Sequence, residues 1–308
     1  MKIALYSNKG EKIMVGKNKT GQIVLNIIFI LLCTAAVAPF LLLLSSSLTD
    51  EATLMREGYN FIPRVFSFNA YVYLFSSSMK IIKGYGITIL VTVLGTTLSV
   101  LMTTLFAYPL SRKELPWRGF FAFFVFFTML FNGGLVPTYM MWTQSFHIKN
   151  TLWALIIPGL LMNGFYIIMM RSFFQANIPD ALIEAARIDG GGEYRILFQV
   201  VTPLSKPIMA TMALMIGLGY WNDWMNSLYY ITDDKLFSIQ AILNTIITNI
   251  QFLTSGQSSA ASSVNVANLP SIGIRMAIAV IGILPVLCIY PFFQKYFVKG
   301  IVVGGVKG

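Results

Sequence analysis

The chain has 308 residues, of which 56% are hydrophobic and only 11% are charged. Soluble domains carry about a quarter charged residues, so this composition excludes a soluble protein and indicates a polytopic membrane protein. The 22 Lys and Arg residues outnumber the 12 Asp and Glu residues, but they are scattered through short segments, which argues against a nucleic-acid partner.

The N-terminal part of the chain is predicted to hold a tail and two membrane spans. Residues 1–22 form a lysine-rich polar tail, and residues 23–44 are the first apolar segment of about the length that crosses a bilayer. That segment is too long for a signal-peptide core and no small-residue cleavage pattern closes it, so a retained helix is expected. Residues 45–83 mix charged and aromatic side chains, as in a loop on the membrane surface, and residues 86–110 form the second span.

Four further spans follow a tight basic loop at residues 111–118. They are predicted at residues 119–141, 151–170, 203–224 and 275–293. The third span is interrupted by Asn132, Gly133, Gly134 and Pro137, and a long polar loop at residues 225–274 separates the fifth span from the sixth. The predicted fold is therefore all-α, with six transmembrane helices.

A polar segment at residues 177–203 separates two apolar spans and is predicted to form a helix-turn-helix hairpin on the membrane surface. Pro179 suits the first helical position, because its φ is fixed and it lacks an amide hydrogen. Ala185 and Ala186 leave a low, smooth face that another protein could approach closely. Three glycines, residues 190–192, are expected to end the first helix because glycine adopts positive φ at little cost.

The distribution of basic residues predicts the orientation in the membrane. Six spans place both termini and the hairpin on one side, and 15 of the 22 Lys and Arg residues lie on that side. Cytoplasmic loops carry the excess of Lys and Arg in membrane proteins. Both termini and the hairpin are therefore expected in the cytoplasm.

The predicted spans lack the groups that several kinds of chemistry require. No Asp or Glu lies inside them, Asp223 being the nearest, which argues against a proton-driven carrier. A single histidine, His147, cannot form a two-histidine zinc site, and no Gly-x4-Gly-Lys-Ser/Thr segment offers a nucleotide site. The two cysteines fall inside apolar runs, so neither a disulfide nor a metal site is predicted. Energy for transport would have to come from a partner.

Neutral hydrogen-bonding side chains remain as candidates for the lining of a substrate pathway. Aromatic rings stack on the apolar faces of sugars, and amides bond to hydroxyl groups without requiring a charged solute. An interfacial aromatic belt and helix–helix contacts are alternative roles for the same residues. The candidates are Asn132, Tyr139, Asn163, Tyr166, Tyr220, Trp221, Asn222 and Trp224.

The hairpin resembles the EAA loop of the membrane subunits of ABC importers. Glu184, Ala185 and Ala186 are followed at the spacing of that motif by Gly190, Val200 and Pro203; valine replaces the commoner isoleucine, and Thr202 replaces the usual leucine. Segments at residues 132–139, 171–174, 178–190 and 221–224 are similar to the carbohydrate-uptake branch, and within it to the permeases named for complex-polysaccharide and lipoprotein-linked uptake. The similarity runs from about residue 23 to the C-terminus.

This resemblance implies a permease domain at residues 23–308 in the bacterial plasma membrane, paired with a second, non-identical permease. It implies an ATPase dimer that binds ATP and Mg²⁺, so that this chain has no cofactor of its own. It also implies an extracytoplasmic solute-binding lipoprotein that engages residues 225–274, and an oligosaccharide as the transported solute. The terminal segment, residues 298–308, would lie near the ATPase pair. The residues expected to couple to the ATPase are Glu184, Ala185, Ala186, Asp189, Gly190 and Pro203.

Two other functions stay open from the sequence. An integral-membrane enzyme acting on lipid-linked sugars would need a carboxylate cluster at a membrane face, which Glu184, Asp189 and Glu193 could supply. An ABC permease for a non-sugar solute would share the coupling hairpin and differ only in the pathway lining.

Overall fold

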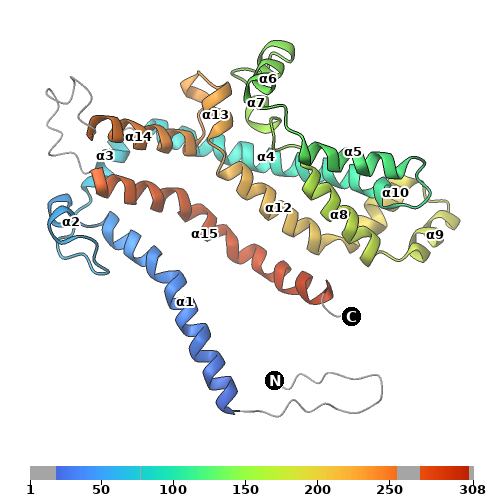
Figure 1. The fold of residues 1–308 in the computed structure, drawn as a ribbon, viewed down its shortest axis with the longest axis horizontal. Helices are drawn as coiled ribbons and strands as arrows, with labels where there is room; N and C mark the ends of the chain where they lie inside the picture. Colours follow the sequence, from blue (N-terminus) through green and yellow to red (C-terminus); the bar gives the residue numbers. More distant parts are fainter. Residues whose placement is uncertain (1–18, 77, 255–270, 305–308) are drawn as a thin grey trace.

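The computed structural model describes residues 19–76, 78–254 and 271–304, and the regular elements in these ranges are helices. Helix α12 (Lys206–Trp221) packs against both α4 (Ser78–Ser111) and α15 (Ser271–Gly304), and α1 (Lys19–Ser47) contacts α15 near one end and then diverges from it (Figure 1). The helices of the first half are α1 (Lys19–Ser47), α2 (Glu51–Glu57), α3 (Asn69–Ser76), α4 (Ser78–Ser111), α5 (Arg118–Leu130), α6 (Leu135–Met140), η1 (Met141–Ser145), α7 (Trp153–Ile156) and α8 (Gly164–Asn177). Those of the second half are α9 (Asp180–Ile188), α10 (Glu193–Ile196), η2 (Leu197–Val201), α11 (Thr202–Leu204), α12 (Lys206–Trp221), α13 (Met225–Tyr230), η3 (Asp234–Leu236), α14 (Ile239–Thr254) and α15 (Ser271–Gly304).

Among the described residues, three helices are long and apolar enough to cross a membrane: α1, α4 and α15. Two bent pairs raise that number to five if each counts as one span; α5 meets α6 and η1 at 112°, and the α10–α11 segment meets α12 at 83°. The first pair breaks at residues 131–134, where the interruption of the third span was predicted. The six-span topology stays a prediction.

The prediction of one continuous helix over residues 151–170 is wrong. The chain forms the four-residue helix α7, leaves the helical conformation around Pro158 and Gly159, and resumes as α8 at Gly164. Pro158 cannot donate a helical hydrogen bond, and Gly159 adopts φ +72°. Asn163 then caps α8 by accepting a hydrogen bond from the backbone N–H of Phe165 at 2.9 Å.

Three smaller boundaries also differ from prediction. Pro179 is the residue before the first turn of α9, with ψ 135°, so the helix begins at Asp180. Helix α4 begins eight residues before the predicted start of the second span, and α2 and α3 occupy the loop before it. The segment at residues 225–274 contains α13 and the 16-residue helix α14, whose apolar residues at helical spacing pack against α4 and α15. Its residues 255–270, like residues 1–18 of the predicted tail and 305–308 at the C-terminus, lie outside the described residues.

Close contact between α4 and α12 forms the centre of the core. A Cβ atom added to Gly95 of α4 would lie 2.5 Å from the ring of Tyr220 on α12, so only glycine fits there. The Tyr220 hydroxyl donates to the carbonyl of Ile156 at 2.8 Å, which ties α7 to the same contact. Buried tyrosines need such a partner, since an unpaired hydroxyl in an apolar core is costly.

At the other end of the molecule, α2 holds the start of α15. The carboxylate of Glu51 accepts hydrogen bonds from the backbone N–H groups of Ile272 and Gly273, both at 2.9 Å. These are donors that the first turn of a helix leaves unpaired, and the negative charge complements the helix dipole. The contact fixes the position of α15 relative to the segment that follows α1.

Candidate functional site

The hairpin at residues 177–203 lies at one end of the helical bundle, between α8 and α12 (Figure 1, right). Gly190 adopts φ +77°, as expected for the glycine that ends α9. Its N–H donates to the carbonyl of Arg187, and the N–H of Gly191 donates to the carbonyl of Ala186, both at 2.9 Å. This pair of hydrogen bonds is a Schellman motif, which satisfies two carbonyl groups at the helix end.

The three glycines of the turn have different requirements. A Cβ atom on Gly191 would lie 2.7 Å from the carbonyl oxygen of Ala186, so backbone crowding excludes a side chain there. Gly190 has open space around it but a left-handed conformation. Gly192 has open space and φ −71°, so it is free of both constraints. The local geometry of the turn thus depends on two of the three glycines.

Helix α9 buries one face and exposes the other. Ile183 is buried against the rest of the protein, whereas Glu184, Ala185 and Asp189 are exposed and Ala186 is half-buried. Ile188 is 86% exposed, which is unusual for an isoleucine in a helix that has an apolar core to pack against. The docking face, defined here as Leu182, Glu184, Ala185, Ile188 and Asp189, therefore combines apolar and acidic side chains in the open. Pro203, the last residue of the predicted motif, is also exposed.

The sequence analysis missed Leu182 and Ile188 as members of this face. Their spacing to Ala185 follows the helical repeat, on the side opposite to buried Ile183. The sequence of α9 therefore carried a signal for this face, because its apolar residues lie on two sides of the helix instead of one. Exposed apolar patches rimmed by polar residues are typical of protein-interaction sites.

Ion pairs attach the two ends of α9 to the end of α4 and the loop after it. The Lys113 ammonium lies 3.0 Å from one carboxylate oxygen of Asp180, and the guanidinium of Arg112 lies 3.6 Å from the other. The hydrogen bond from Lys113, and then its positive charge, lower the pKa of the Asp180 carboxyl. At the far end of the helix, Arg187 lies 3.7 Å from Glu114.

Arg187 also contacts α10 through Glu193. Its Nε and Nη2 atoms donate to Glu193 Oε1 at 3.0 and 2.9 Å, while the Tyr108 hydroxyl of α4 donates to Glu193 Oε2 at 2.7 Å. The hydrogen bond from Tyr108, followed by that from Arg187, lowers the pKa of the Glu193 carboxyl against the opposing effect of burial. These side chains border a cavity of about 550 Å³ between α4 and the hairpin.

The carboxylates that an enzyme would need do not form a cluster. Glu193 is paired with Arg187 and Tyr108, whereas Glu184 is exposed on α9 and Asp189 directly after its end. Within the described ranges, no group of three or more His, Cys, Asp or Glu side chains is placed to hold a metal ion.

The predicted pathway residues lie at several separate places, and some serve local roles. Asn163 caps α8, and Asn132 forms a similar turn by accepting from the N–H of Gly134 at 2.9 Å. The Asn222 amide donates to the carbonyl of Leu218 at the end of α12.

The aromatic candidates are equally dispersed. The ring of Tyr139 stacks on that of Tyr230, with centroids 5.8 Å apart, and Tyr166 meets Phe165 edge to face. Trp224 is partly exposed at the start of α13. The structure therefore does not gather these residues around one opening.

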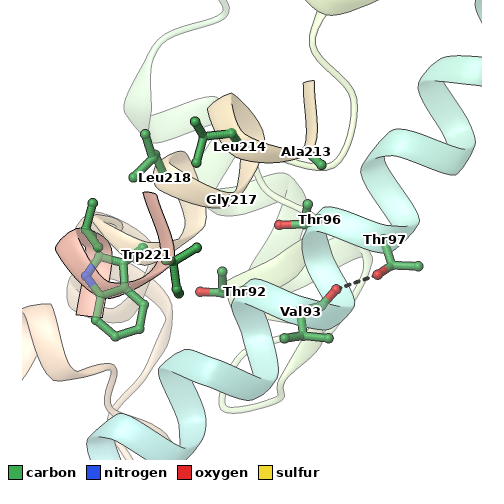
Figure 2. Close-up of a pocket in the computed structure, with 11 residues that line it drawn as sticks. Thr92, Val93, Thr96, Thr97, Ala213, Leu214, Gly217, Leu218 and Trp221 are labelled. Atoms are coloured by element: carbon green, nitrogen blue, oxygen red, sulfur yellow. Dashed lines mark hydrogen bonds between the residues drawn. The ribbon is translucent and has the colours of Figure 1, made fainter. Parts of the chain in front are cut away.

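Trp221 is the predicted pathway residue that borders a cavity. Its ring lines a space of about 290 Å³ between α4, α12 and α15, and its indole N–H donates to the carbonyl of Gly282 at 3.1 Å. Figure 2 shows Thr92 and Thr96 of α4 on the opposite wall, facing Gly217 and Trp221. Both hydroxyl groups are buried and have no hydrogen-bond partner among the described residues.

The sequence analysis missed these threonines, although a signal was present. Thr88, Thr92, Thr96, Ser99 and Thr103 recur every three or four residues, so they lie on one face of α4. Hydroxyl groups on one face of an apolar helix are expected either to bond to a neighbouring helix or to line a polar path.

Comparison with known proteins identifies relatives over most of the chain. Residues 97–303 match the family described as binding-protein-dependent transport system inner membrane component. Protein LplC of Bacillus subtilis (strain 168) is 37% identical over 272 residues, covering 88% of this chain and 90% of its own. The polygalacturonan/rhamnogalacturonan transport system permease protein YtcP of the same organism is 38% identical over 283 residues, covering 92% and 95%.

A solved structure extends the likeness to the fold. One chain of a bacterial ABC transporter involved in the import of the acidic polysaccharide alginate superposes with a TM-score of 0.75 at 27% sequence identity. The match covers 96% of this chain and all of the other. The fold in Figure 1 is thus similar to that of one chain of a solved ABC transporter.

Proposed function

The chain belongs to the family of binding-protein-dependent transport system inner membrane components, and we propose that it forms half of the translocation pathway of an ATP-driven oligosaccharide importer. The family match over two thirds of the chain is the observation that carries this proposal. The relatives include transport system permease proteins, which makes the chain a transport subunit and leaves ATP hydrolysis to a partner. They give no support to an enzyme acting on lipid-linked sugars.

The exposed hairpin is the part of this chain suited to meet an ATPase. Glu184, Ala185, Ala186, Asp189, Gly190 and Pro203 are the coupling residues that the motif predicts. Leu182 and Ile188 extend this set, because they place apolar surface beside the carboxylates of the docking face. Ile188 is exposed in this chain alone, so burying it against a partner would remove apolar surface from water and stabilise the complex.

The remaining assembly follows from the family and the charge pattern. A permease of an ABC importer works with ATPase subunits, a substrate-binding protein and a second permease domain. Here the second permease is proposed to be a non-identical subunit, the binding protein a lipoprotein, and ATP and Mg²⁺ to bind the ATPase dimer. The chain is a multi-pass cell-membrane protein. The lysine and arginine distribution favours cytoplasmic termini and a cytoplasmic hairpin.

The proposed solute is an oligosaccharide derived from a complex polysaccharide. The relatives named above include a polygalacturonan/rhamnogalacturonan permease, and arabinooligosaccharide permeases named AraQ are 26–28% identical. The cavity beside Trp221 offers an aromatic ring and two unpaired hydroxyl groups, chemistry that suits a polyhydroxylated solute.

Reconstitution tests the assignment. The permease pair, the ATPase and the binding protein are placed in nanodiscs, and ATP hydrolysis is measured with and without oligogalacturonides. Stimulation that requires the loaded binding protein is the expected result. Stimulation by amino acids or peptides in place of sugars would contradict the proposed substrate class. ATP hydrolysis that does not respond to any loaded binding protein would contradict the proposal that the chain is part of an importer.

A further inference from the structure

The polar contacts between the hairpin and the rest of the protein are confined to one short segment. Within the described residues, every ion pair and side-chain hydrogen bond that joins α9 or α10 to a residue outside the hairpin ends on residues 108–114. That segment is the last turn of α4 and the start of the loop after it. Two of its members, Tyr108 and Arg112, are themselves buried in the protein, at 5% and 7% exposure.

These contacts hold both ends of α9. Asp180, the first residue of the helix, is paired with Lys113 and Arg112, while Arg187, in its last turn, is paired with Glu114. Glu193 adds a third attachment, since it joins Arg187 to the Tyr108 hydroxyl of α4. A single attachment would leave α9 free to pivot, whereas attachments at both ends fix the direction in which its docking face points.

These ion pairs are not needed to keep the hairpin folded. The side chains of Asp180, Glu114 and Glu193 are more than half exposed, and exposed ion pairs contribute little to folding. The hairpin is already anchored by Ile183, Ile196 and Leu197, which are buried in the core. A set of directional, solvent-accessible contacts on top of an apolar anchor is better suited to orienting a surface than to keeping it folded.

The continuous helix α4 leads from these contacts to the centre of the bundle. Tyr108 and Thr96 are twelve residues apart on one helix, about 18 Å along its axis. Thr96 faces Gly217 of α12 and lines the cavity beside Trp221. A displacement of α9 that carries Tyr108 with it therefore reaches the α4–α12 contact without passing through a flexible segment.

We propose that residues 108–114 form a second coupling element, the α4 clamp, which orients the docking face and transmits the hairpin's displacement to α4. The clamp consists of Tyr108, Arg112, Lys113 and Glu114 together with Asp180, Arg187 and Glu193. Its members are positioning residues, because none of them belongs to the docking face or lines the cavity beside Trp221. The inference rests on the proposed transport function and adds to it the route by which motion enters the membrane domain.

The test uses the reconstituted complex and compares oligosaccharide uptake with ATP consumed. Tyr108→Phe removes one hydroxyl and leaves the ring in place, and Arg187→Met removes the contacts to Glu114 and Glu193. Arg195→Met is the matched control, since Arg195 lies on the same hairpin but bonds only within it, to Gln199 at 2.9 Å. For both clamp variants we expect normal assembly and basal ATP hydrolysis, with uptake per ATP reduced about fivefold or more, the lower range of coupling between sites.

Two further measurements separate the clamp from a structural role. The double variant Tyr108→Phe/Arg187→Met should be no worse than the poorer single variant, because both interrupt the same connection. Arg187→Lys, which keeps the charge but has a single donor group, should recover part of the lost uptake. Both results are read as uptake per ATP at unchanged thermal stability of the complex, because loss of one shared hydrogen-bond network would give the same pattern in stability alone.

Proportional loss of uptake, assembly and thermal stability in the clamp variants would overturn the proposal, as would an equal loss in Arg195→Met. These outcomes differ from failure of the proposed function itself. That failure would appear in the unmodified complex, as ATP hydrolysis that does not respond to the loaded binding protein.

Discussion

Replacement of Gly190 by alanine tests whether the turn of the hairpin sets the docking face. The left-handed conformation at φ +77° costs an L-residue about 1–2 kcal/mol. No atom lies within 4 Å of the added Cβ, so the penalty comes from the backbone and not from a clash. Either the strain is stored in the folded hairpin, or the end of α9 and its Schellman hydrogen bonds rearrange.

Gly192→Ala provides the matched comparison. Gly192 belongs to the same turn and also has open space, but its φ of −71° suits alanine. The substitution restricts the unfolded chain and should be neutral or stabilising by about 0.4–1 kcal/mol. Both variants restrict the unfolded chain to the same extent, so they should differ by the backbone penalty at residue 190 alone, about 1–2 kcal/mol, which corresponds to roughly 5- to 30-fold in a local equilibrium.

The assay is titration of the ATPase subunit against the permease pair in nanodiscs, followed by stimulated ATP hydrolysis. When only a fraction of the hairpins is competent to dock, the apparent dissociation constant equals the intrinsic one divided by that fraction, so binding becomes weaker. Gly190→Ala should weaken ATPase binding several-fold, Gly190→Asn less, because asparagine tolerates the left-handed region, and Gly192→Ala not at all. Equal binding by Gly190→Ala and Gly192→Ala would refute the role assigned to the turn.

Three other predictions concern topology, the cavity and pH. In a background without the two native cysteines, a cysteine at Gly192 should resist membrane-impermeant thiol reagents in intact cells while one at Asp234 reacts; external labelling at position 192 would reverse the topology. Thr96→Val should lower oligosaccharide uptake without loss of thermal stability, since its hydroxyl has no partner in the described structure; unchanged uptake would remove this residue from the pathway. The Glu193 pKa is lowered from its ordinary value of 4.5, so the stability it contributes is complete above that value and is lost as pH falls through the lower, folded-state pKa. Glu193 should therefore stay ionised between pH 6 and 8, and its titration should not change uptake per ATP in that range. If uptake depends on pH there and Glu193→Gln abolishes that dependence, the lowered pKa is contradicted.

Much of the fold could be predicted because it depends on local chemistry. Apolar runs of bilayer length predict helices α1, α4 and α15, and the Asn132–Gly134 break in the third span is visible as a cluster of residues that disfavour helix. The glycine stop of α9 follows equally from neighbouring residues, since a helix end needs a left-handed residue wherever it lies in the fold. Family resemblance came from the same local motifs.

The incorrect predictions for residues 151–170 and 225–274 also have local causes in the sequence. Pro158 and Gly159 interrupt the fourth span, and the averaged hydropathy of residues 151–170 conceals them. In the segment at residues 225–274, the polar composition of the centre concealed the helical spacing of Ile239, Leu243 and Ile250.

Only the tertiary structure decided which polar groups share a site. Trp221 meets the carbonyl of Gly282, 61 positions away, and Tyr108 meets Glu193, 85 positions away. Neither pairing has a sequence pattern, because both depend on how the helices cross. That crossing is selected by steric fit, as where Gly95 accepts the ring of Tyr220. Sequence determined the helices and the turn of the hairpin, whereas close packing between distant helices placed the cavity and the α4 clamp.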